Sequence, residues 1–329
     1  MVKNLLLTFI FIFFAACSKS PEPETVPHWY TSPPVDYEYF YAVGIGNDAS
    51  EAKNNALSNF RTSLIETLDI EFKRSNHRLG YLDENVLAVI SRANDEIVNT
   101  LFIRNVSIEA STVFNFKTLL LLKIERQDIF KYADLASSSK LASVKKSYDM
   151  LHNLPDLQKY MELKILISDF AKLAAYTQLK ELSISTFNAS EDFKNLRNIY
   201  ESLMDLRANI TFYVLSDANS IGFVNFIKEG IAKESLALHS KMRDDNSYKV
   251  LITSASENSI DYSFMQSKTV LQAKLYNAKG EQVAQKQHTF IGKSRKSHKD
   301  AKEQATLSLK SKITKIGFFD FVGLNPRER

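Results

Sequence analysis

The stretch that decides the fold reads YFYAVGIGNDASEAKNNALSNFRTSL over residues 39–64. Asp36 to Val43 is rich in aromatic and β-branched residues, which predicts a strand that ends at Gly44-Ile45-Gly46. Small and apolar residues then recur at helical spacing, at Ala49, Ala52, Ala56, Phe60 and Leu64. We therefore expect a helix to follow the strand and to lay a stripe of small residues against a sheet.

The next sixty residues extend this unit. A second helix is predicted from Glu84 to Leu101, and two strands from Ile103 to Phe116 and from Lys117 to Arg126. The order strand, helix, helix, strand, strand predicts an α+β fold in two layers.

Gly44-Ile45-Gly46 also matches the start of a dinucleotide-binding fingerprint. That fingerprint needs an acidic residue after a second parallel strand, and Asp69 instead falls at the end of the predicted helix. A turn between strand and helix explains the glycines better, with Asn47, Asp48 or Ser50 as the helix cap. We expect no cofactor.

The N-terminus has the parts of a secretory leader. Lys3 supplies the positive charge, a largely apolar run extends from Leu5 to Phe14, and small residues Ala15 and Ala16 precede Cys17. Ten such residues are too few to span a bilayer, which takes roughly 20. Phe14-Ala15-Ala16-Cys17 resembles the lipobox of bacterial lipoproteins, with Phe14 where that motif usually has leucine.

The lipobox implies cleavage between Ala16 and Cys17 and lipidation of Cys17, the only cysteine in the chain. Several acyl chains on one residue give stable membrane anchoring. Ser18 stands where an aspartate would imply retention at the inner membrane, so the resemblance implies the outer membrane. Residues 17–27 combine the lipidated cysteine with a proline-rich tether, SKSPEPETVP.

A second resemblance covers about residues 27–132. The segments Pro27-His28-Trp29-Tyr30 and Tyr39 to Gly46, followed by Ser50 with Ala52 and Ala56, resemble the Lpp-twenty family of bacterial outer-membrane lipoproteins. The family implies a single α+β domain, here residues 28–132, in an envelope protein. This chain departs from the family in Tyr30 and in being much longer than its single-domain members.

The rest of the chain predicts two further parts. Residues 133–208 have helical periodicity with breaks at 154–156 and 187–190, so we expect a helical bundle or arm of about three helices. Residues 209–320 predict strand, helix, three strands and helix, and this order resembles the periplasmic domains of TolB-type and FlgT-type envelope proteins. Residues 321–329 are expected to form a C-terminal tail. The fold class is thus α+β, with two small helix-on-sheet domains separated by a helical part.

No catalytic or metal-binding pattern occurs in the sequence. The histidines have no metal-ligand spacing, and no nucleophile elbow, phosphate-binding loop or calcium loop is present. We therefore expect no metal site and no enzymatic activity. A net charge of +4 excludes nucleic acid as an expected partner. The one basic cluster includes Lys293, Arg295, Lys296 and Lys299, which could face an anionic surface or lie in a solvated loop.

Two classes of function remain. The first is a non-enzymatic envelope lipoprotein, facing the periplasm or the cell surface, that binds other envelope proteins; the resemblances imply flagellar or outer-membrane assembly. The second is a periplasmic carrier for lipid or another hydrophobic ligand, which needs an apolar cavity. The partner and the oligomeric state are left open.

Lipidation of Cys17 is directly testable. We expect cells fed a palmitate analogue to label the wild-type protein and not the Cys17→Ala variant, because the lipobox implies that the lipid is first attached to the Cys17 thiol, which alanine lacks. Equal labelling of the two proteins, or a mature N-terminus other than Cys17, contradicts the lipobox.

Overall fold

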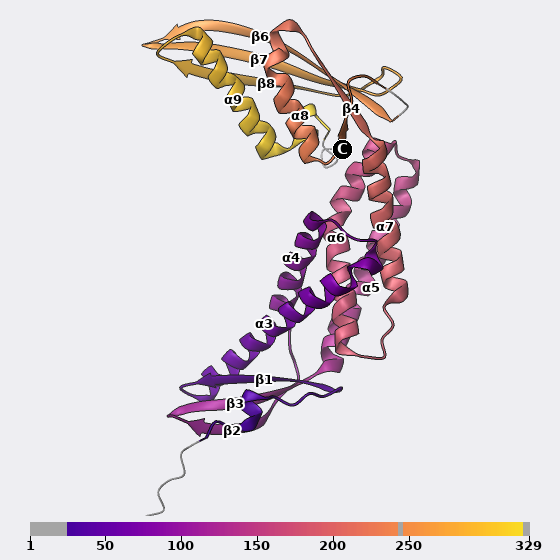
Figure 1. Ribbon diagram of the computed structural model, residues 1–329, viewed down its shortest axis with the longest axis vertical. Helices are drawn as coiled ribbons and strands as arrows, with labels where there is room; N and C mark the ends of the chain where they lie inside the picture. The colour runs from indigo at the N-terminus through magenta and orange to yellow at the C-terminus, as the bar shows by residue number, and fades with distance from the viewer. Residues whose placement is uncertain (1–24, 243–245, 325–329) are drawn as a thin grey trace, which may run out of the picture. The chain divides into compact units, whose positions relative to one another are not determined.

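The computed structural model describes residues 25–242 and 246–324 (Figure 1). Their contacts form two compact units. Unit 1 holds the described residues up to 75 together with 87–138 and 174–190, and unit 2 holds 76–86, 139–173 and 191 onward. Each unit contains one sheet and several helices, which confirms the predicted α+β class.

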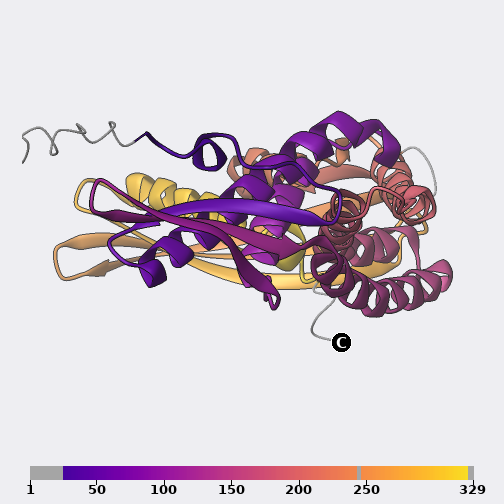
Figure 2. The same ribbon diagram turned by 90° about the horizontal axis from the view of Figure 1, so that it is seen from below.

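Unit 1 is built on a three-stranded antiparallel sheet in the order β1-β3-β2. The strands are β1 (Tyr39–Gly46), β2 (Val106–Phe114) and β3 (Lys117–Glu125). Helix α3 (Ala49–Ser75) runs along one face of this sheet (Figures 1 and 2). Helix α4 (Glu84–Thr100) precedes β2. These elements follow the predicted order, with β1 extending through both glycines to Gly46.

The predicted small-residue stripe of α3 is buried. Its buried residues recur at every fourth position, at Ala52, Ala56, Phe60, Leu64, Leu68 and Phe72. Asp48 caps the helix, because its Oδ1 accepts a hydrogen bond from the Glu51 backbone N–H at 2.8 Å. The Glu51 carboxylate in turn accepts from the Asn47 N–H at 2.7 Å, which closes the turn on itself.

Glycines let α3 approach β1 closely. A Cβ atom on Gly44 would lie 2.1 Å from the carbonyl oxygen of Ala52 and 2.4 Å from the backbone nitrogen of Ala56. A Cβ atom on Gly46 would lie 2.3 Å from the nitrogen of Ala52. Since these neighbours are backbone atoms, no rotamer change can make room, and the helix packs here only against glycine.

The opposite face of the sheet is also apolar. Leu119 and Leu121 alternate with the residues that face α3 and are nevertheless buried. The short helix α2 (His28–Thr31) lies against β3 and carries Trp29, whose side chain is half-buried. The chain around Trp29 therefore belongs to the folded unit.

Three long helices lie between the sheets in the sequence: α5 (Arg126–Met150), α6 (Asp156–Ser183) and α7 (Ser190–Asn209). The breaks fall where the sequence predicted them, with Pro155 directly before α6. Residues 133–208 are predicted from the sequence to form a domain of their own, but the helices that they form are shared between the two units. The predicted domain boundaries themselves stay predictions. None of the described helices is both long enough and apolar enough to cross a membrane.

Unit 2 contains a five-stranded sheet in the order β5-β4-β6-β7-β8. The strands are β4 (Thr211–Ser216), β5 (Ala237–Leu238), β6 (Ser247–Asp261), β7 (Phe264–Tyr276) and β8 (Gln282–Ser294). The helices are α8 (Val224–Lys233), α9 (His298–Ile316) and α10 (Phe318–Val322). Strand β4 pairs in parallel with β5 and β6, whereas β6, β7 and β8 form antiparallel hairpins.

Two regions of unit 2 differ from the sequence analysis. The sequence predicted one helix after the first strand of this unit, and the structure has a 3-10 turn (Ala218–Phe223), α8 and the short strand β5 there. The first residues of the segment expected as a tail, 321–324, are part of the folded unit, because Phe321, Val322 and Leu324 are buried. The three phenylalanines of the segment FFDFV are buried, and burial of their side chains stabilises this short helix. Five residues are too few for a periodic sequence pattern.

Unit 2 repeats the glycine contact of unit 1. A Cβ atom on Gly292 of β8 would lie 1.9 Å from the carbonyl oxygen of Ala301 and 2.5 Å from the nitrogen of Ala305, both on α9. The buried residues of α9 recur at every fourth position, at Ala301, Ala305, Leu309 and Ile313.

Adding one methyl group at either contact should be destabilising. We expect Gly44→Ala and Gly292→Ala each to lower the free energy of unfolding by about 1–3 kcal/mol, since the methyl group can be accommodated only by moving a helix. Gly222→Ala is the matched control, because a Cβ atom there meets no atom within 4 Å. Chemical denaturation of the three variants measures the differences, and an unchanged Gly44→Ala variant contradicts the close contact.

Candidate functional site

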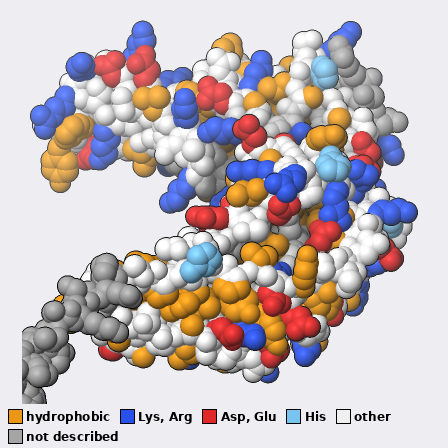
Figure 3. Space-filling view, turned by 60° about the horizontal axis from the view of Figure 1, so that its bottom comes forward, with side chains coloured by type: hydrophobic (Ala, Val, Ile, Leu, Met, Phe, Trp, Pro, Cys, Tyr) orange, Lys and Arg blue, Asp and Glu red, His pale blue; other side chains and the backbone are white. Residues whose placement is uncertain are grey.

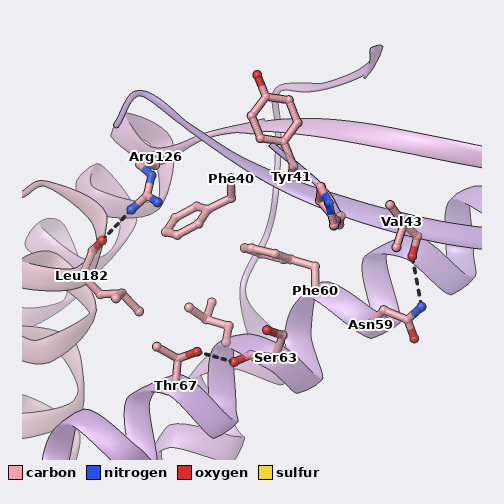
Figure 4. Close-up of a pocket in the computed structure, with 12 residues that line it drawn as sticks. Phe40, Tyr41, Val43, Asn59, Phe60, Ser63, Thr67, Arg126 and Leu182 are labelled. Atoms are coloured by element: carbon pink, nitrogen blue, oxygen red, sulfur yellow. Dashed lines mark hydrogen bonds between the residues drawn. The ribbon is translucent and has the colours of Figure 1, made fainter. Parts of the chain in front are cut away.

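The best-defined pocket of unit 1 lies between β1 and α3 and has a volume of about 380 Å³. We call it the β1 groove. Figure 4 shows Arg126 and Leu182 at one end, Asn59 beside Val43 at the other, and Phe40 and Phe60 between them. The two phenyl rings are 5.5 Å apart and tilted, so the floor of the groove is aromatic.

Strand β1 is an edge strand, which gives the groove an open row of backbone groups. In an antiparallel pair, alternate residues direct both N–H and C=O toward the partner strand. The residues whose backbone N–H and C=O groups point away from β3 are Tyr39, Tyr41, Val43 and Ile45. The carbonyls of three of them accept hydrogen bonds from side chains outside the sheet. Asn59 Nδ2 donates to the Val43 carbonyl at 3.0 Å, and Asn55 Nδ2 donates to that of Ile45 at 2.7 Å.

Arg126 occupies the other end of this edge. Its Nε donates to the Tyr39 carbonyl at 3.2 Å, its Nη1 donates to the Leu182 carbonyl at 2.8 Å, and its guanidinium lies 3.8 Å from the centroid of the Phe40 ring. Burial lowers the pKa of Arg126, and the charge of Asp36 works in the opposite direction. Arg126 therefore joins β1, the start of α5 and the end of α6 within unit 1.

Tyr41 is left between these capped positions. Among the described residues, neither its N–H nor its C=O has a hydrogen-bond partner. An unpaired donor and acceptor on an edge strand can pair with one residue of another extended chain. The β1 groove thus combines a short polar edge at Tyr41 with an apolar recess at Phe40, Phe60 and Leu64.

Unit 2 has a pocket of similar volume, about 380 Å³, between α6 and the C-terminal segment. Lys164 pairs with the carboxylate of Glu234 at its rim, and the Tyr160 hydroxyl donates to the Glu234 carbonyl at 3.0 Å. Burial is the main reason that the pKa of Tyr160 rises to about 12. These contacts hold α6 against the end of α8, and we assign the pocket a structural role.

Titratable side chains are sparse at the sites described above. Within residues 25–242 and 246–324, no group of three or more His, Cys, Asp or Glu side chains could hold a metal ion. The β1 groove is lined by one cation, Arg126, and by no carboxylate or imidazole. It is suited to binding rather than to proton transfer.

The residues singled out from the sequence lie elsewhere. Ala16 and Cys17 fall outside the described residues. Lys293, Arg295, Lys296 and Lys299 lie together at the end of β8 and the start of α9, in unit 2. Lys293 pairs with Asp261 at 2.8 Å, and the Arg295 guanidinium lies 4.8 Å from the centroid of the Phe264 ring. Their contact with an anionic surface stays a prediction.

The sequence analysis did not select the residues of the β1 groove. Asn55 and Asn59 are four residues apart on α3, which places them on one side of the helix. That spacing was a usable signal, but an asparagine pair on an exposed helix is too common to indicate an edge strand beside it. Arg126 could not be chosen, because its partner Leu182 is 56 residues away in the sequence.

No protein-family model and no curated protein sequence matches the chain. Solved structures do match, among them the secreted protein HP1454 from Helicobacter pylori, at 12% identity over 88% of this chain and 100% of that one, with a TM-score of 0.37. A minor lipoprotein from Acinetobacter baumannii matches at 7% identity over 33% of this chain and 88% of its own, with a TM-score of 0.28. Lipoprotein GNA1162 from Neisseria meningitidis matches at 11% identity over 32% and 99%, with a TM-score of 0.24. With TM-scores below 0.5, none of these likenesses determines the fold or function of this chain, and the Lpp-twenty and TolB/FlgT resemblances stay predictions.

One histidine is buried in unit 2. His288 of β8 is 3% exposed, stacks on the ring of Phe321 at 4.2 Å, and has its Nε2 atom 2.7 Å from the Phe321 carbonyl. Burial is the largest reason that its pKa is lowered; Lys312 and Lys286 act in the same direction, and the hydrogen bond opposes them. The neutral ring therefore attaches α10 to the sheet.

This predicts a loss of stability in acid. Below about pH 6.5 the unfolded chain protonates His288 while the folded chain does not, so the free energy of unfolding falls as the pH drops from there toward the lowered pKa. In His288→Gln, which does not titrate, this part of the pH dependence should be missing. Denaturation of both proteins between pH 7 and pH 5 measures it, and parallel curves contradict the assignment.

Proposed function

We propose that the chain is a bacterial envelope lipoprotein, anchored in the outer membrane by an acylated Cys17, that binds other envelope proteins and has no catalytic turnover. Flagellar or outer-membrane assembly is the process we propose for it. The leader and the proline-rich tether support the anchor. The β1 groove supports binding, because it offers an unpaired strand edge next to an apolar recess.

The partner that fits this groove is an extended protein segment. One of its residues would pair with the N–H and C=O of Tyr41, and a neighbouring apolar side chain would enter the recess between Phe40 and Phe60. Asn59 and Arg126 occupy the carbonyls on either side, so the added segment can pair over only a short length. The contact would therefore depend on the recess for most of its affinity.

A periplasmic carrier is the second candidate. Phe40, Phe60 and Leu64 form an apolar lining with the Arg126 guanidinium at one end, an arrangement that suits an aliphatic carboxylate. The volume of about 380 Å³ lies near the lower end of the range for ligand pockets, about 300–1,000 Å³, so the groove would hold a short chain rather than a whole lipid.

A large side chain placed in the recess tests whether the function of the protein depends on the β1 groove. Ser63 and Ser58 are both exposed on α3, but only Ser63 lines the β1 groove. We expect Ser63→Trp to abolish complementation of a deletion strain at unchanged protein level, because the indole occupies the recess, and we expect Ser58→Trp to complement normally. Equal complementation by both variants contradicts the proposal.

A photo-crosslinking residue at position 63, with position 58 as the control, then identifies what the groove holds in intact cells. A discrete protein adduct at position 63 alone supports the envelope-protein function. A fatty acid that co-purifies with the wild type and not with Ser63→Trp, in the absence of any protein adduct, supports the carrier instead.

A further inference from the structure

The β6–β7 hairpin of unit 2 ends in exposed apolar side chains. Its turn is two residues long, Tyr262-Ser263, between the paired residues Asp261 and Phe264. Tyr262 is 97% exposed and Ile260 is 72% exposed. The two side chains therefore contribute almost nothing to the core of the unit.

The tyrosine also stands at a position that favours glycine. Tyr262 has a φ of 54°, and a positive φ at the first residue of a two-residue hairpin turn is normally supplied by glycine. A bulky residue in this conformation is strained and is not compensated here by burial. Its side chain needs an explanation other than the stability of the fold.

Basic residues lie at the same end of the sheet. Met265 of β7 pairs with Ser294 of β8, so the loop between β8 and α9 lies beside the turn. Between residues 293 and 303, five lysine or arginine residues stand against two carboxylates, Asp300 and Glu303. Figure 3 shows hydrophobic and basic side chains next to each other at the left-hand end of this unit.

The neighbouring charges leave this end positive. Asp261, which precedes the turn, is paired with Lys293, and Arg295 stacks on Phe264, which follows the turn. Lys296 and Lys299 are exposed. The tip therefore presents Tyr262 and Ile260 flanked by cations.

We propose that this tip, Ile260 and Tyr262 with Arg295, Lys296 and Lys299, docks on the surface of a bilayer that contains anionic phospholipid. A tyrosine at the headgroup level has its ring in the apolar region and its hydroxyl in water, and the lysines and arginine attract lipid phosphates. Exposed apolar side chains at the end of a hairpin, flanked by cations, are complementary to a surface that has negatively charged headgroups above an apolar interior. This contact is independent of Cys17 and would be a second, non-covalent attachment to the membrane.

Vesicle binding tests the proposal without the lipid anchor. The probe is the chain from residue 17 to 329 with Cys17→Ser, floated with vesicles of phosphatidylcholine alone or of phosphatidylcholine mixed with phosphatidylglycerol. We expect flotation only with the anionic vesicles, and weaker binding at raised salt. Lys296→Ala and Lys299→Ala should each reduce the partition coefficient by about fivefold. Lys279→Ala, at the turn on the opposite end of β7 and β8, should leave it unchanged.

A fluorescence measurement tests insertion of the tip separately. In a Trp29→Phe background, the emission of Tyr262→Trp should shift to the blue when anionic vesicles are added. Phe116→Trp is the matched control, because Phe116 is also fully exposed in a hairpin turn with a positive φ but lies in unit 1. The absence of anionic-vesicle binding overturns the proposal, and so does binding that is unchanged in Lys296→Ala and Lys299→Ala or an unshifted Tyr262→Trp. These results would not affect the proposed function as an anchored envelope lipoprotein, provided that Cys17 is still lipidated.

Discussion

The close approach of a strand glycine to the backbone of an alanine-bearing helix is the contact on which both units depend. Gly44 meets Ala52 and Ala56 in unit 1, and Gly292 meets Ala301 and Ala305 in unit 2. Small residues on both sides bring helix and strand together until backbone contacts backbone, so the position of each helix is determined within a narrow range. The larger apolar residues farther along the helices then fill the widening space, as Phe60 and Leu64 do on α3.

This contact also positions the surfaces that we assign to binding. Because α3 is held against β1, Asn55 and Asn59 reach the outward carbonyls of Ile45 and Val43, whereas the carbonyl of Tyr41 has no hydrogen-bond donor among the described residues. In unit 2 the contact between Gly292 and α9 holds the β8–α9 loop beside the β6–β7 turn. In both units a rigid packing contact thus lies a few residues from the exposed surface for which we propose a binding role.

Much of the fold could be predicted because its signals are local. The alanine stripe of α3, the glycines of β1 and the break at Pro155 are patterns of a few residues, and each corresponds to an observed element. The α10 segment was assigned to a tail because five residues are too short for periodicity, and its burial depends on His288 and other distant residues. The β1 groove was missed for the same reason, since Arg126 and Leu182 or Val43 and Asn59 meet only after folding.

The open edge at Tyr41 is the central claim about how this chain binds a partner, and amide hydrogen exchange tests it most directly. In the free protein, the amides of Ala42 and Gly44, which face β3, should exchange only on unfolding of the unit, and the amide of Tyr41 should exchange faster by orders of magnitude. A Tyr41 amide that is protected as strongly as those of Ala42 and Gly44 would show that the edge is already paired, and this would contradict the account.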